Sequence, residues 1–240
     1  MKRCLFLILL VSALALPAVA SATPTFGAGV DSDFFNQSWG VWSSTKTVSS
    51  LKALYSAGGR VGRADTHWSA VEPNAPKGNK HTYNWTYDDM IAGEMAQARL
   101  RWEPTLQGTP KWAQAHRANT LHLSTGKFVV TLPPGNNAVF ATYATAFMRR
   151  YGAHGSFWSS HRNLPYEPVT TVEVWNEPDN THNWGPTVDL QDYAKEYEAV
   201  RTAVRRVNRG VHVMTGGLAW TRSSLPRLLK AFIHKPIDTV

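Results

Sequence analysis

Apolar and polar positions along the chain follow two periods that alternate from one stretch to the next. Apolar residues three and four positions apart predict helices, and short runs of β-branched and aromatic residues predict strands. Strands are predicted at 26–31, 59–65, 101–107, 169–177, 211–217 and 237–240. Helices are predicted between them at 47–59, 86–100, 137–152, 189–210 and 224–234.

The helix ends also carry signals. Gly58 suits the position just past the first helix, because glycine adopts a left-handed backbone without strain. Thr86 can cap the second helix, and Gly210 is expected to end the fourth. The third helix should bury one aromatic face, and the fourth should turn Tyr193 and Tyr197 inward.

Strict alternation of strands and helices implies parallel strands joined by right-handed crossovers. This pattern fits either an open doubly wound sheet or part of an eight-fold barrel. The segments after the strands (66–85, 108–136 and 177–188) are long and rich in tryptophan, which is typical of a barrel. No Gly-x-Gly-x-x-Gly follows the first strand, and no phosphate-binding loop motif occurs. We therefore predict an α/β fold, an incomplete (β/α)8 TIM barrel containing strands 1–5 and the start of strand 6.

Composition supports a globular protein, with 43% hydrophobic and 18% charged residues. The formal net charge is +8, and Lys2 and Arg3 of the N-terminal segment contribute two of these charges. The arginines at 201–209 have helical spacing near a helix end, which favours a solvated helix face over a nucleic-acid surface. We expect no nucleic-acid partner.

Residues 1–22 have the layout of a secretory signal peptide: two basic residues, an apolar run from Leu5 to Leu16, Pro17 and then small residues. The apolar run is too short to span a bilayer comfortably. Cys4 is the only cysteine and would leave with the signal. We expect a secreted, cysteine-free mature protein that begins at about residue 23 and has no membrane anchor.

The fourth strand carries the candidate chemistry in "VTTVEVWNEPDN" (169–180). Pro178 cannot donate to a sheet ladder and marks the strand end, which leaves Asn176 and Glu177 at its C-terminal rim. Side chains alternate along a strand, so Glu173, Trp175 and Glu177 should share the barrel interior. A carboxyl group at the mouth of a barrel, beside aromatic rings, suits a general acid.

This stretch resembles the fourth-strand motif of a clan of retaining (β/α)8 glycoside hydrolases that includes cellulases of family 5 and β-xylosidases of family 39. Other stretches match the clan's strands 2, 3, 5 and 6 in order: "VGRADTHWSAVEP" (61–73), "LQGTPKWAQ" (106–114), "VMTGGLAW" (213–220) and "KPIDTV" (235–240). The resemblance covers roughly residues 26–240. It implies hydrolysis of O-glycosidic bonds in poly- or oligosaccharides, with a carbohydrate as the substrate.

The resemblance also implies roles for individual residues. Glu177 would be the acid/base, and Asn176 would bind the sugar 2-hydroxyl. Arg63 would lie beneath the site and orient carboxylates, and Glu173 is expected to form a structural ion pair with it. Three tryptophans are candidates either for stacking on sugar rings or for packing in the core: Trp68, Trp112 and Trp184.

One part of the clan's pattern is missing. The clan's nucleophile is a second Glu at the end of the seventh strand, and no glutamate follows the fifth strand at such a position. We interpret residues 23–240 as the N-terminal part of a longer catalytic domain, inactive alone and monomeric when complete. The alternative is a non-catalytic carbohydrate-binding or scaffold protein on the same fold.

Other reaction classes find less support. No Gly-x-Ser-x-Gly elbow is present, which argues against a lipid or peptide hydrolase. No His-Glu-x-x-His motif or close histidine pair occurs, so neither a metal nor another cofactor is expected.

Overall fold

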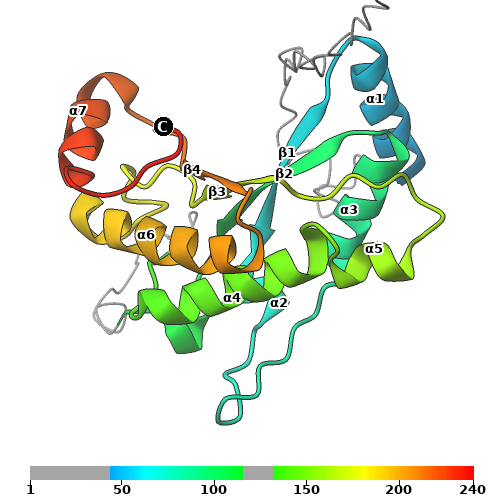
Figure 1. Cartoon of the computed structure of the whole chain (residues 1–240). Helices are drawn as coiled ribbons and strands as arrows, with labels where there is room; N and C mark the ends of the chain where they lie inside the picture. Colours follow the sequence, from blue (N-terminus) through cyan, green and yellow to red (C-terminus); the bar gives the residue numbers. More distant parts are fainter. Residues whose placement is uncertain (1–43, 116–131) are drawn as a thin grey trace, which may run out of the picture.

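A computed structural model describes residues 44–115 and 132–240 (Figure 1). Its strands are β1 (Val61–His67), β2 (Arg101–Gln107), β3 (Thr171–Val174) and β4 (His212–Thr215). Its longer helices are α1 (Ser44–Ser56), α3 (Thr86–Gln97), α4 (Asn137–Tyr151), α6 (Leu190–Val207) and α7 (Thr221–Ala231). The short helices are α2 (Trp68–Val71), α5 (Ser156–Ser160) and the 3-10 turn η3 (Lys111–Ala113).

The four strands form one parallel sheet in the order β1-β2-β3-β4. The register pairs Arg63 with Glu103 and Thr105 with Glu173, so these side chains fall on one face. Sequential parallel strands joined by helices are the arrangement of a barrel segment, and the predicted fold class is confirmed. The predicted first strand and the signal segment lie outside the described residues.

The predicted sixth strand begins beside β4. Thr239 forms a parallel bridge with Met214, and the N–H of Thr215 donates to its carbonyl at 3.0 Å. Asp238 fixes this segment by accepting from Arg201 and from the N–H of Val213. Within the described residues, this segment pairs with β4 through a single β-bridge.

Helices α4 and α6 lie side by side beneath the sheet in Figure 1. Asn136 caps α4 by accepting from the N–H of Ala138, and Asp189 caps α6 by accepting from two backbone N–H groups. The aromatic face predicted for α4 is buried, as are Tyr193 and Tyr197 of α6. Both predictions of inward faces are confirmed.

Two predicted helix ends need correction. Thr86 is the first residue of α3 and follows the cap position, Trp85, which makes no side-chain cap bond. The side chain of Asn84 instead accepts from the N–H of Thr86 at 3.1 Å, because it precedes the first turn and reaches forward to it. Helix α6 ends at Val207 with Asn208 as its cap, before Gly210. Gly58 has a φ of 102°, which confirms the expected left-handed position after α1.

Aromatic rings fill the layer between the sheet and the helices. Trp102 of β2 packs on Phe147 with ring centroids 5.2 Å apart, and Trp175 packs on Phe140 at 5.9 Å. Because these rings cover one face of the sheet, the polar side chains of the strands gather on the other, inner face. Trp102 and Trp175 are both buried in this layer.

Candidate active site

The inner face of the sheet holds a buried carboxylate, Glu173 of β3, which is only 3% exposed. Its Oε2 accepts from Nε of Arg63 at 2.6 Å and from Oγ1 of Thr105 at 2.8 Å. Its Oε1 accepts from the N–H of Gly217 at 2.8 Å. A buried charge is costly unless it is paired and hydrogen-bonded, and Glu173 is both. The expected Arg63–Glu173 ion pair is confirmed.

Arg63 also reaches the rim. Its Nη2 donates to Oδ1 of Asn176 at 2.9 Å. Since the amide oxygen of Asn176 faces a guanidinium, its NH2 group is the part left to meet another acceptor, such as a hydroxyl oxygen. The structure therefore brings three of the residues singled out in the sequence into one network.

The chain turns sharply where β3 ends. Trp175 has a φ of 66° and Glu177 a φ of 47°, left-handed values that residues other than glycine rarely adopt. The predicted alternation is therefore wrong beyond Val174. Trp175 turns away from Glu173 and packs into the helix layer against Phe140.

Neighbouring groups hold this turn in place. The N–H of Trp175 donates to the carbonyl of Leu106 at 2.9 Å, and its indole N–H donates to the carbonyl of Asn183 at 2.6 Å. The N–H of Glu177 donates to the carbonyl of Gly217 at 2.9 Å. A Cβ on Gly216 would lie 2.5 Å from the carbonyl oxygen of Trp175, so this close approach requires glycine.

The Glu177 side chain lies at the C-terminal rim of the sheet and is half-buried. Its Oε2 accepts from Nδ2 of Asn183 at 2.9 Å and from Nδ2 of Asn180 at 3.2 Å. Two amide donors on one carboxylate oxygen fix the orientation of the group. The arrangement can deliver or accept a proton at a fixed place.

The sequence reasoning did not single out Asn180, Asn183 or Asp179. Asp179 accepts from the N–H groups of Ala219 and Trp220, both at 2.9 Å, and so ties the turn to the start of α7. The run "PDNTHN" (178–183) carried the available signal, because Asp and Asn side chains commonly bond nearby backbone and stabilise turns.

Two of the three tryptophans expected to stack on sugar lie in the core. Trp68 is 0% exposed, and its indole N–H donates to the buried carboxylate of Glu72 at 2.9 Å. Trp184 is 1% exposed and packs edge-on against Trp175 and Tyr193. Stacking by Trp68 and Trp184 is corrected to core packing, because both rings are buried, although Trp184 also borders a cavity described below. Trp112 is partly exposed, and its N–H donates to the Glu72 carbonyl.

A cavity of about 610 Å³ lies on the inner face, with Arg63, Glu103 and Glu173 along its polar side and leucines of α7 opposite. Burial and the nearby Glu173 carboxylate raise the pKa of Glu103, and Arg63 opposes the shift. The polar side of the cavity thus carries two carboxyl groups beside one guanidinium.

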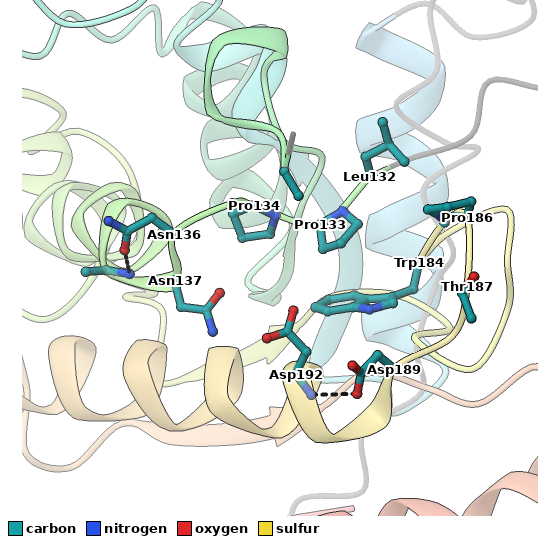
Figure 2. A pocket seen from close by; sticks show the side chains of 14 residues that line it. Leu132, Pro133, Pro134, Asn136, Asn137, Trp184, Pro186, Thr187, Asp189 and Asp192 are labelled. Atoms are coloured by element: carbon teal, nitrogen blue, oxygen red, sulfur yellow. Dashed lines mark hydrogen bonds between the residues drawn. The ribbon is translucent and has the colours of Figure 1, made fainter. Parts of the chain in front are cut away.

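A second cavity, of about 450 Å³, lies beside the rim (Figure 2). Its walls come from the segment before α4 and from residues 184–192. The Trp184 ring lies between Pro133 and Asp192 in this view, and Asn137 projects from the first turn of α4. Asn176 and Glu177 are not part of its lining. This cavity is therefore separate from the carboxylate network.

The described residues offer neither a metal-ligand cluster nor a membrane-spanning helix. Across residues 44–115 and 132–240, no group of three or more His, Cys, Asp or Glu side chains is arranged to hold a metal ion. Within the same residues, every helix is too short or too polar to cross a bilayer.

Comparison with known proteins places the fold. No family model matches the chain, and no curated protein does. A GH39 enzyme from Xanthomonas axonopodis pv. citri superposes with a TM-score of 0.58 at 22% identity, over 90% of this chain and 40% of its own. A monomeric β-xylosidase from Caulobacter crescentus CB15 superposes with a TM-score of 0.59 at 19% identity, over 90% of this chain and 41% of its own. Thermotoga maritima Cel5A superposes with a TM-score of 0.54 at 13% identity, over 85% of this chain and 56% of its own.

These similarities show the fold: the chain has the architecture of part of a (β/α)8 TIM barrel, as predicted. The chain spans about 40% of the length of the first two structures.

Proposed function

We propose that this chain is the N-terminal part of a secreted retaining glycoside hydrolase in which Glu177 is the acid/base. The observation that carries the proposal is the network beneath the rim, in which Arg63 binds both Glu173 and Asn176 while amides of the next loop hold Glu177. Active sites of this fold lie at the C-terminal ends of the strands, where Glu177 is found.

The proposed reaction has two steps. A second carboxylate attacks the anomeric carbon, and Glu177 gives its proton to the departing glycosidic oxygen. Glu177 then removes a proton from water, which attacks the same carbon and releases the second carboxylate. Asn176, whose oxygen is bound to Arg63, donates from its NH2 group to a hydroxyl of the sugar.

Glu173 is unsuited to the role of second carboxylate, because three donors occupy its oxygens beneath the rim. We assign that role to a strand that follows residue 240. Retaining enzymes place the two carboxyl groups about 5 Å apart, so the second group would lie opposite Glu177 across the mouth.

The test is hydrolysis by the protein expressed from its complete reading frame. Aryl glycosides and polysaccharides are offered, and the first-formed product is observed by proton NMR. We expect a product with the anomeric configuration of the substrate. An inverted product contradicts the retaining mechanism. Sugar binding without any hydrolysis contradicts the enzyme and favours a carbohydrate-binding protein on the same fold.

A further inference from the structure

Glu173 connects three parts of the inner face through one carboxylate. Arg63 comes from β1, Thr105 from β2, and Gly217 from the segment after β4. All three donors lie 2.6–2.8 Å from the carboxylate oxygens. The side chain is thus fixed from both sides of its own strand.

Gly217 connects the Glu173 carboxylate to the backbone at the rim. Its N–H donates to Glu173, and its carbonyl accepts from the N–H of Glu177 at 2.9 Å. One residue therefore separates the buried carboxylate from the backbone of the proposed acid/base. The neighbouring Gly216 lies against the carbonyl of Trp175, so residues 216–217 contact both left-handed residues of the turn.

Left-handed backbone at residues other than glycine is strained and persists only where neighbours enforce it. We infer that Glu173 is a positioning residue for Glu177: held by Arg63 and Thr105, it fixes Gly217, and Gly217 fixes the turn that presents the Glu177 carboxylate. This inference rests on the proposed function of Glu177.

A carboxylate suits this position better than an amide does. Both oxygens of Glu173 accept hydrogen bonds, one from Arg63 and Thr105 and the other from Gly217. A glutamine has one acceptor and one NH2 group. In either orientation, its NH2 would face an N–H donor, so one of the two connections must break. Glu173→Gln therefore breaks the connection that Glu173 makes between Arg63 and Gly217, with little change in side-chain volume.

The experiment compares Glu173→Gln with Glu198→Gln in the protein expressed from its complete reading frame. Glu198 lies on helix α6 and pairs with Lys235, so the control makes the same chemical change away from the inner face of the sheet. Two quantities are measured. The first is kcat/KM on a glycoside with a poor leaving group and on one with an activated aryl group. The second is hydrogen exchange in peptides spanning residues 174–180.

We expect Glu173→Gln to lose at least ~10-fold more activity on the poor leaving group than on the activated one, because misplaced proton donation harms only the former. Exchange at 174–180 should also become ~10-fold faster relative to other buried segments. The control should change neither quantity. Equal losses on both substrates, or unchanged exchange at 174–180, overturn the inference.

A third variant covers the case in which Glu173→Gln fails to fold. Thr105→Val removes one donor and leaves the bonds from Arg63 and Gly217, so it should show the same leaving-group preference to a smaller degree. If the unmodified protein hydrolyses no glycoside, the proposed function fails. The exchange measurement still decides whether Glu173 holds the turn.

Discussion

Arg63 binds Asn176 through Nη2 at 2.9 Å while its Nε binds Glu173 at 2.6 Å, so one guanidinium joins a buried carboxylate to a rim amide. The side chain of Arg63 is 25% exposed and that of Glu173 is 5% exposed. Removing the cation leaves an anion in a site with little water. The pair therefore links the stability of the sheet to the order of the rim.

From this pair we predict that Arg63→Met lowers the free energy of unfolding by ~2–4 kcal/mol, because breaking a buried pair leaves an uncompensated charge. Arg60→Met is the matched control, since Arg60 donates only to the carbonyls of Tyr55 and Gly59 in the described structure. Urea unfolding at pH 7 measures both variants. Similar losses in the two would show that the ion pair contributes little.

A second prediction concerns Asp88, which is buried in the first turn of α3. Burial raises the pKa of Asp88 to about 7, although its hydrogen bond from Thr66 opposes the shift. Because the folded state binds this proton more tightly than the unfolded state, stability is fully present below about pH 4 and falls as the pH rises to about 7. Asp88→Asn should remove this loss.

We expect Asp88→Asn to be more stable than the unmodified protein by ~2–4 kcal/mol at pH 8, with the advantage shrinking toward pH 4. Thermal unfolding from pH 4 to pH 8 measures the difference. Asp89→Asn is the control, because Asp89 pairs with Arg150 and should lose stability instead. A difference between Asp88→Asn and the unmodified protein that does not change with pH contradicts the account.

Glu196 of α6 gives a third prediction. It is completely buried, and neither carboxylate oxygen has a hydrogen-bond partner among the described residues. Burial, with a smaller contribution from Asp192, raises the pKa of Glu196 well above its usual range. Glu196→Met keeps a similar volume and removes the unsatisfied polar group, so it should stabilise the fold by ~1–3 kcal/mol at pH 7.

Glu198→Met tests whether this gain is specific to the buried position. Glu198 lies two residues further along α6, is partly exposed and pairs with Lys235. Its replacement should leave stability unchanged or slightly lower. A loss of stability in Glu196→Met, measured by the same unfolding experiment, would mean that its carboxyl group has a partner important for folding.

The N-terminal segment gives a fourth prediction. If residues 1–22 are a signal peptide, the exported protein should begin near Ser21 or Thr23, after the small residues that precede them. N-terminal sequencing of protein recovered from the culture medium measures this directly. An exported chain that still begins with Met1 contradicts the assignment.

Much of the fold follows from pattern alone. Helices α4 and α6 are long enough for a 3.6-residue period to show, and their buried faces match the prediction. The Arg63–Glu173 pair was predictable as well, because two charged residues on the inner faces of strands must find each other. Short elements such as α2 carry too few residues to show a period.

The turn at Trp175 cannot be predicted from such patterns. Its left-handed backbone depends on groups distant in the sequence: the carbonyls of Leu106 and Gly217 and the bare Cα of Gly216. For the same reason, the sequence left the choice between stacking and core packing open for Trp68, and the donors of Glu177 were missed. Local sequence predicts where a strand ends, but tertiary contacts decide where the next side chains point.

The central claim is that Glu177 is the acid/base, and its most direct test is Glu177→Gln in the protein expressed from its complete reading frame. The kcat/KM values are measured on a glycoside with a poor leaving group and on an activated aryl glycoside, with Glu198→Gln as the control. We predict a loss of ~10²-fold or more on the first substrate and a far smaller loss on the second, which needs no protonation of its leaving group. Equal losses on the two substrates would contradict the assignment of Glu177.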